Sequence, residues 1–172
     1  VLTLIPHRGA YVRTLTRREV TEVLVIQETL TALVTRLATE HIADGENRQL
    51  FNRVYNELIA NTSSADIHVL LDRRAEFYDT LVTLSGNSEL KRFVPIPQTN
   101  LLRTQFVRHF SREERQRELQ EYSQIAKHVL NGAASLAENA MRLHIKNSRL
   151  SIERLPDDAF AATTETFTTK SS

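Results

Sequence analysis

The chain has 172 residues, enough for one domain with a sizeable core, and its formal net charge of +1 gives no overall field to attract nucleic acid or a membrane surface. It contains no cysteine, which excludes disulfides, thiolate metal sites and a cysteine nucleophile and agrees with a cytoplasmic protein. Only four glycines and four prolines interrupt helical periodicity, and no apolar run could span a bilayer, so we expect an all-α protein.

The first fifteen residues differ from the rest, because they predict a β-hairpin. Apolar residues at positions 2 and 4, and at 11 and 12, flank a turn at Pro6-His7-Arg8-Gly9. Two strands alone are marginal in water. Because the chain also opens on Val1, we expect residues 1–15 to be the remnant of a preceding domain that is otherwise absent.

The following residues, 16–155, predict an antiparallel bundle of six to seven helices. Apolar residues recur every three or four positions in segments 16–42, 46–60, 67–87, 88–110, 111–131 and 133–152. Pro95 and Pro97 must break or kink the fourth segment, since each proline removes a backbone donor and clashes with the preceding turn. Residues 156–172 are rich in threonine and have no period, so we expect a flexible tail.

Several helix ends can be read from polar residues and glycine. Ser111 and Glu114 have the spacing of a capping box, in which each side chain bonds the backbone of the other. Gly86 is placed to end the segment 67–87 by adopting a left-handed conformation. The polar turn at 61–64 is expected to cap the start of that same segment.

Segment 67–87 carries the least expected residues of the chain. Arg74 and Tyr78 lie on its apolar stripe, where a packed helix normally presents carbon. Tyr122, His144 and, after the prolines, Arg103 occupy inner positions of other helices. Several polar groups that converge inside a bundle predict a polar cavity.

Each of these residues also has a purely structural interpretation. A tyrosine in a core usually bonds a backbone carbonyl, and a single buried histidine is more often a core residue than a ligand. An arginine can pair with an internal carboxylate, for which Glu28 and Glu138 are candidates. The chain has no phosphate-binding glycine loop and no nucleophile elbow, so we expect a binding domain and not an enzyme.

A series of short strings follows the order of the predicted helices. The strings are Arg18-Glu19, Glu22-Val23-Leu24, Leu37-Ala38, Glu40-His41, Phe77-Tyr78, Ser85-Gly86-Asn87, Glu121-Tyr122 and Ala140-Met141-Arg142-Leu143-His144. Together they resemble the FCD domain, the ligand-binding C-terminal domain of the FadR subfamily of GntR-type transcription regulators. The segment 6–12 resembles the wing that ends the N-terminal winged helix of those regulators.

That resemblance implies a metal site that this chain has changed. Many members bind a divalent metal through an aspartate and three histidines, and the matching positions here are Arg74, Tyr78, Tyr122 and His144. Arginine offers only donors and neutral tyrosine is a poor ligand, so we expect no metal and no cofactor. Arg74 could instead hold an anionic effector such as a carboxylate directly, with Tyr78, Arg103, Tyr122 and His144 around it.

The resemblance also implies partners. We expect a small-molecule effector, a homodimer, no membrane, and DNA bound mainly through the absent N-terminal domain of a bacterial regulator, with Arg8 and Gly9 at the tip of the wing. One alternative is a helical metal-dependent enzyme or metal-binding domain that uses His68, Asp72 and His144. A further alternative is a helical interaction domain with no small ligand.

Overall fold

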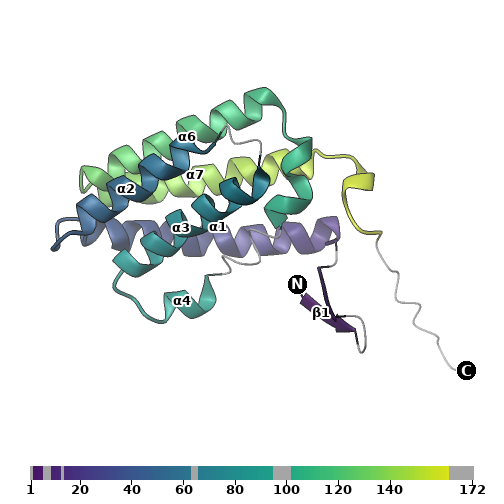
Figure 1. Ribbon diagram of the computed structural model, residues 1–172, viewed down its shortest axis with the longest axis horizontal. Coiled ribbons are helices and arrows are strands. Elements are labelled where there is room, and N and C mark those ends of the chain that lie inside the picture. The colour runs from purple at the N-terminus through teal and green to yellow at the C-terminus, as the bar shows by residue number, and fades with distance from the viewer. Residues whose placement is uncertain (1, 6–8, 13, 63–65, 95–101, 163–172) are drawn as a thin grey trace, which may run out of the picture.

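A computed structural model describes residues 2–5, 9–12, 14–62, 66–94 and 102–162, and Figure 1 shows a bundle of helices with a hairpin beyond one end. The helices are α1 Arg17–Glu40, α2 Asn47–Ala60, α3 Ile67–Leu84, α4 Leu90–Phe93, α6 Arg112–Leu130 and α7 Ala134–Glu153, with 3-10 turns η1 Val107–His109 and η2 Asp157–Ala159. The all-α prediction is confirmed. Within the described ranges, no helix is long and apolar enough to cross a membrane.

The predicted hairpin is present. Strands β1 Leu2–Ile5 and β2 Gly9–Val12 are antiparallel, with Leu2 opposite Val12 and Ile5 opposite Gly9. In Figure 1 the pair lies outside the bundle, beyond the N-terminal end of α1. Gly9 begins β2, whereas Arg8, the other residue predicted to contact DNA, lies outside the described residues.

Most predicted helix ends are confirmed. The capping box of Ser111 and Glu114 opens α6. Gly86 follows α3 with φ of 65°, the left-handed conformation that glycine adopts without a steric penalty. The cap of α3 differs from the prediction: the carboxylate of Asp66 accepts from the backbone N–H of His68 at 2.9 Å, so the cap is not the turn at 61–64.

The predicted helix over 88–110 is broken into pieces. Its first part is the single turn α4, and residues 102–106 are helical and run into η1. The two prolines fall in the segment 95–101, outside the described residues. The described residues on either side of this segment belong to separate helical pieces, which agrees with the expectation that proline interrupts a helix.

The helices α1 and α7 pack antiparallel along the bundle. Arg17, in the first turn of α1, donates to the carbonyls of Glu153 and Leu155 at the C-terminal end of α7, both at 2.7 Å. The main core gathers apolar side chains from α1, α2, α3, α4, α6 and α7, with Phe51, Phe77 and Met141 fully buried.

A second, smaller cluster lies at the N-terminal end of α1. It joins Leu15, Val20, Leu24, Leu102, Phe106, Phe110, Ile152, Ala159 and Phe160. The prediction of a flexible tail from residue 156 is therefore wrong for its first residues: the ring of Phe160 lies 5.1 Å from that of Phe106, and Arg17 stacks on it at 4.1 Å. The sequence pattern missed this because two buried residues after a short turn produce no period.

Candidate functional site

Arg74 projects from α3 into the bundle, and only 5 % of the residue is exposed. Its Nη1 donates a hydrogen bond to Oε1 of Glu118 at 2.6 Å and another to the hydroxyl of Tyr122. Both partners belong to α6 and are one turn apart, so α6 presents them on one face. A buried guanidinium needs an anionic partner, and Glu118 supplies it.

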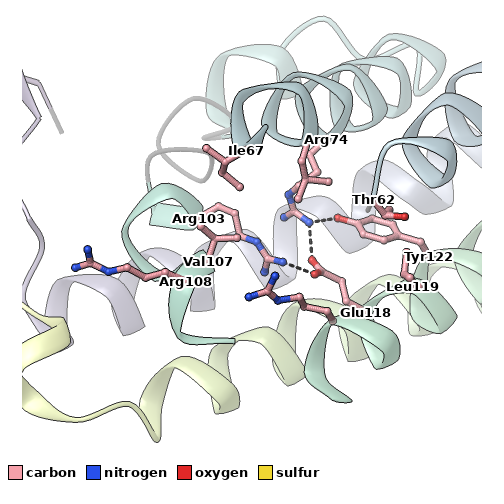
Figure 2. A pocket seen from close by; sticks show the side chains of 11 residues that line it. Thr62, Ile67, Arg74, Arg103, Val107, Arg108, Glu118, Leu119 and Tyr122 are labelled. Atoms are coloured by element: carbon pink, nitrogen blue, oxygen red, sulfur yellow. Dashed lines mark hydrogen bonds and ion pairs between the residues drawn. The ribbon is translucent and has the colours of Figure 1, made fainter. Parts of the chain in front are cut away.

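Arg103 approaches the same carboxylate from the short helical segment 102–106. It is 8 % exposed, its Nη2 donates to Oε2 of Glu118, and its guanidinium lies 4.4 Å from the centre of the Phe110 ring. Figure 2 shows Glu118 between the guanidinium groups of Arg74 and Arg103. One carboxylate therefore ties α3 and the segment 102–106 to α6.

The charges of this cluster are strongly coupled. Burial favours the neutral form of Glu118, but Arg103 and Arg74 outweigh burial and lower the pKa of Glu118 to about 2. Burial also opposes the charge of Arg74, yet Tyr122 and Glu118 raise its pKa overall. Burial lowers the pKa of Arg103 despite Glu118, although arginine keeps its proton in proteins. Glu118 is thus ionised at neutral pH between two cations.

A cavity of about 220 Å³ opens beside this cluster (Figure 2). It is lined by Thr62, Ile67, Leu70, Arg74, Arg103, Val107, Arg108, Arg115, Glu118, Leu119 and Tyr122. Among these described residues four are arginines and only one is acidic. The lining combines a positively charged set of donors with an apolar wall, which is the composition of a site for a small anion.

The sequence-predicted residues divide into two groups. Arg74, Arg103 and Tyr122 line the cavity, whereas Tyr78 and His144 are not among the lining residues and lie in the core near Tyr122. Burial raises the pKa of Tyr122 well above its ordinary value and raises that of Tyr78. Both phenols are therefore neutral at physiological pH.

His144 packs against Tyr122 in the core. It is fully buried, its ring lies 4.7 Å from the ring of Tyr122, and its Nδ1 lies 2.8 Å from Oε2 of Glu121. Its Nε2 is buried without a hydrogen-bond partner among the described residues. The same carboxylate of Glu121 accepts from Asn147 at 2.6 Å, which fixes its orientation.

The four positions that the resemblance matches to metal ligands do not fit a metal here. Arg74 offers only donors, Tyr78 and Tyr122 are neutral phenols, and His144 is a lone imidazole among them. The described part of the chain has no group of three or more histidine, cysteine, aspartate or glutamate side chains that could hold a metal ion. The alternative set of His68, Asp72 and His144 is therefore wrong: the first two are exposed on α3, and His144 is buried on α7.

Three charged residues of the cavity were not predicted from the sequence: Glu118, Arg108 and Arg115. Glu118 had a usable signal, because it precedes Tyr122 by one turn and so shares its inner face. The candidate partners Glu28 and Glu138 pair with other arginines instead: Glu28 lies 3.8 Å from Arg149, and Glu138 pairs with residues of α1 and α7. Arg108 and Arg115 had no signal, because they follow no apolar stripe.

Comparison with known proteins shows which domain family the helical bundle matches. The sequence model of the FCD domain matches residues 22–147. A solved structure named Streptococcus agalactiae GntR is 19 % identical, covers 88 % of this chain and 75 % of its own, and superposes with a TM-score of 0.64. A second solved structure is 15 % identical, and the match covers 91 % of this chain and 74 % of that chain with a TM-score of 0.67. Its title states that Lar controls the expression of the Listeria monocytogenes agr system and mediates virulence. At these identities the likeness concerns the fold, and no curated protein matches the sequence.

Proposed function

Because the chain belongs to the FCD domain family, we propose that it is the effector-binding domain of a GntR-family transcription regulator, of the FadR subfamily. Two similar structures support this proposal, since one is named GntR and the other is described as controlling gene expression. In this role the chain binds a ligand and catalyses no reaction. It acts in the bacterial cytoplasm, where the regulator binds DNA.

The ligand is a small organic acid or another anion, bound in the cavity beside Arg74. The observation that carries this proposal is the lining itself, in which four arginines face one carboxylate. The guanidinium fork matches carboxylate and phosphate oxygens in pairs. Arg74, Arg103 and Tyr122 contact the anion, while Tyr78 and His144 hold Tyr122 from the core side.

The two ion pairs of Glu118, which we call the Glu118 bridge, give the ligand a way to change the arrangement of the helices. Glu118 on α6 is the carboxylate shared by Arg74 on α3 and Arg103 in the segment 102–106. An anion that enters the cavity competes with Glu118 for the same two guanidinium groups. Binding then favours arrangements in which α6 is less tightly tied to α3, which is a shift of population between two states.

DNA and a second subunit complete the proposed regulator. In this proposal the hairpin β1–β2 is the wing of a winged helix-turn-helix domain, and the sequence between its strands, with Arg8 and Gly9, is the part expected to contact the phosphate backbone. The homodimer forms through α1 and α7, which pack together and expose large apolar side chains: Val25 and Ile26 on α1 and Leu136 and Leu143 on α7. Water-exposed apolar groups of this kind favour association.

Thermal unfolding with a panel of organic acids, sugar acids, phosphate and divalent metals tests the proposal. An anion at about 100 times its dissociation constant is expected to add roughly 2.7 kcal/mol of apparent stability. Calorimetric titration of the best anion should show at least a tenfold loss of affinity in Arg74→Gln and Arg103→Gln. Unchanged affinity in both variants would overturn the assignment of the cavity.

Arg73→Gln is the matched control. Arg73 is the neighbour of Arg74, does not line the cavity, and pairs on the surface with Glu57 and Glu76, each at 2.6 Å. Its replacement removes the same charge from the same helix and should leave affinity within about twofold. Stabilisation by nickel, zinc or manganese that EDTA reverses would contradict the metal-free site.

A further inference from the structure

We infer that Gln105 is a positioning residue that couples the effector cavity to Leu15, which lies where the chain passes from the hairpin to α1. This inference rests on the proposed function, because it names the route by which an anion beside Arg103 acts on the N-terminal residues. It assigns the coupling to the short helical segment 102–106, which carries both Arg103 and Gln105.

Gln105 binds both backbone polar groups of Leu15. Its Oε1 accepts a hydrogen bond from the N–H of Leu15 at 3.1 Å, and its Nε2 donates to the carbonyl of Leu15 at 3.3 Å. The same Nε2 donates to the carbonyl of Ala159 at 3.0 Å, so the amide uses its oxygen and its nitrogen at the same time. One side chain therefore holds the backbone of a residue that is 90 positions away in the sequence.

Leu15 controls where the chain leaves the bundle. Strand β2 ends at Val12 and α1 begins at Arg17, so Leu15 lies in the short connection between the hairpin and the bundle. Its side chain is buried in the second cluster, and its carbonyl also accepts from the N–H of Ala161 at 3.0 Å. A change in the hydrogen bonds of Leu15 therefore changes how firmly the connection to the hairpin is held.

The C-terminal residues hold the same helical segment from a further side. Phe106 follows Gln105 in the chain and is fully buried, and its ring lies 5.1 Å from the ring of Phe160. Arg17, in the first turn of α1, stacks on the ring of Phe160 at 4.1 Å. The segment that carries Gln105 is therefore packed against both the start of α1 and the residues after α7.

Arg103 connects this segment to the effector cavity. It precedes Gln105 by two positions, and residues two apart on a helix do not share a face. The guanidinium of Arg103 is buried and pairs with Glu118 on α6, whereas the amide of Gln105 binds Leu15. The helical segment 102–106 thus contacts the cavity with one side chain and the connection to the hairpin with another.

Release of Arg103 from Glu118 gives the segment 102–106 a second state. The buried ion pair fixes the segment against α6 in a defined geometry. An anion that takes Arg103 from Glu118 removes this tie and leaves the apolar contacts of the second cluster, which are not directional. The hydrogen bonds between Gln105 and Leu15 then open more often, so the cavity and the connection bias the same two-state element.

Amide hydrogen exchange of the whole chain, followed by NMR at pH 7 without polyvalent anions, tests the inference. Gln105→Met keeps the length of the side chain but removes its hydrogen bonds, and should speed exchange of the Leu15 amide at least tenfold. Glu118→Gln imitates the release of Arg103 without a ligand and should speed exchange of the same amide at least threefold. In the double variant Q105M/E118Q, Leu15 should exchange within twofold of its rate in Q105M, because Gln105 carries the effect.

Two variants control for other causes. Gln116→Met makes the same substitution at an exposed position of α6, and Leu58→Ala lowers stability from a fully buried position in the main core. Both should leave the exchange of Leu15 within twofold of the wild type. Arg103→Gln releases the same tie from its other end, and it takes the place of Glu118→Gln if that variant does not fold.

The outcomes separate the inference from the proposed function. Exchange of Leu15 that does not respond to Gln105→Met or to Glu118→Gln would overturn the inference. An equal response to Leu58→Ala, or independent effects that multiply in the double variant, would overturn it as well, and each of these results leaves the anion site intact. Failure of every anion in the thermal panel to stabilise the chain would instead overturn the proposed function.

Discussion

Replacing Glu118 by glutamine should weaken the fold and at the same time strengthen anion binding. The variant keeps the shape of the side chain but removes the negative charge that Arg74 and Arg103 share. An amide also presents a donor to one of the two guanidinium groups, so at least one of them loses its partner. We expect both effects to originate in this one contact.

The loss of stability can be estimated from the ionisation of Glu118. Its pKa is about 2 in the folded chain against an ordinary value of 4.5, and a tenfold change in proton affinity corresponds to about 1.4 kcal/mol. The folded state therefore favours the ionised carboxylate by about 3 kcal/mol, within the range for breaking one buried ion pair. This stabilisation is complete above pH 4.5 and is lost as the pH falls toward 2, because the folded pKa is the lower one.

Urea unfolding followed by circular dichroism provides the measurement, in buffers free of polyvalent anions. At pH 7 the free energy of unfolding of Glu118→Gln should lie about 3 kcal/mol below that of the wild type, and the gap should narrow as the pH approaches 2. Glu57→Gln is the control, since Glu57 forms a half-exposed ion pair with Arg73 and should cost less than about 1 kcal/mol. A difference in unfolding free energy of under 1 kcal/mol at pH 7, or a difference independent of pH, would refute the claim that Glu118 ties α3 and the segment 102–106 to α6.

The same variant tests whether the ligand competes with Glu118. Removing a carboxylate from the cavity removes its repulsion of an incoming anion, which near a protein surface amounts to a few kcal/mol at contact distance. We expect the affinity for the best anion of the panel to rise at least tenfold in Glu118→Gln. An affinity equal to or weaker than that of the wild type would show that the anion does not compete with the Glu118 bridge.

Three further predictions concern the fold and the assembly. Ser111→Ala should cost about 1 kcal/mol in urea unfolding because it removes the N-cap of α6, whereas Ser123→Ala, exposed in the middle of that helix, should not. Ala137→Leu should cost about 1–3 kcal/mol by overfilling a fully buried position on α7. Leu143→Glu should convert a dimer into a monomer in sedimentation equilibrium while Asn139→Glu, also exposed on α7, does not; a dimer that persists would place the interface elsewhere.

The helices could be predicted from the sequence because their ends and faces depend on residues close together in the chain. The capping box at Ser111 and Glu114 and the glycine at position 86 act within a few residues, and both were confirmed. The burial of Phe160 could not be predicted in this way, since it follows a short 3-10 turn and its partner Phe106 belongs to a separate helical segment of the chain. A sequence pattern detects periodic elements, and the residues around Phe160 are not periodic.

The site was only partly predictable for a related reason. Arg74 stood out as a charged residue on an apolar stripe, but its partner Glu118 is 44 positions away on another helix. The rotation and stagger of α3 against α6 decide which carboxylate meets the guanidinium, and a helix pattern specifies neither. Arg108 and Arg115 are exposed, so no burial pattern distinguishes them from ordinary surface residues.

The most direct test of the account is a crystal structure of the chain with the anion that stabilises it most in the thermal panel. We predict an acidic group of that ligand within hydrogen-bond distance of the guanidinium groups of both Arg74 and Arg103, inside the cavity that they line. A stabilising anion bound elsewhere, with the cavity free of it, would contradict the account.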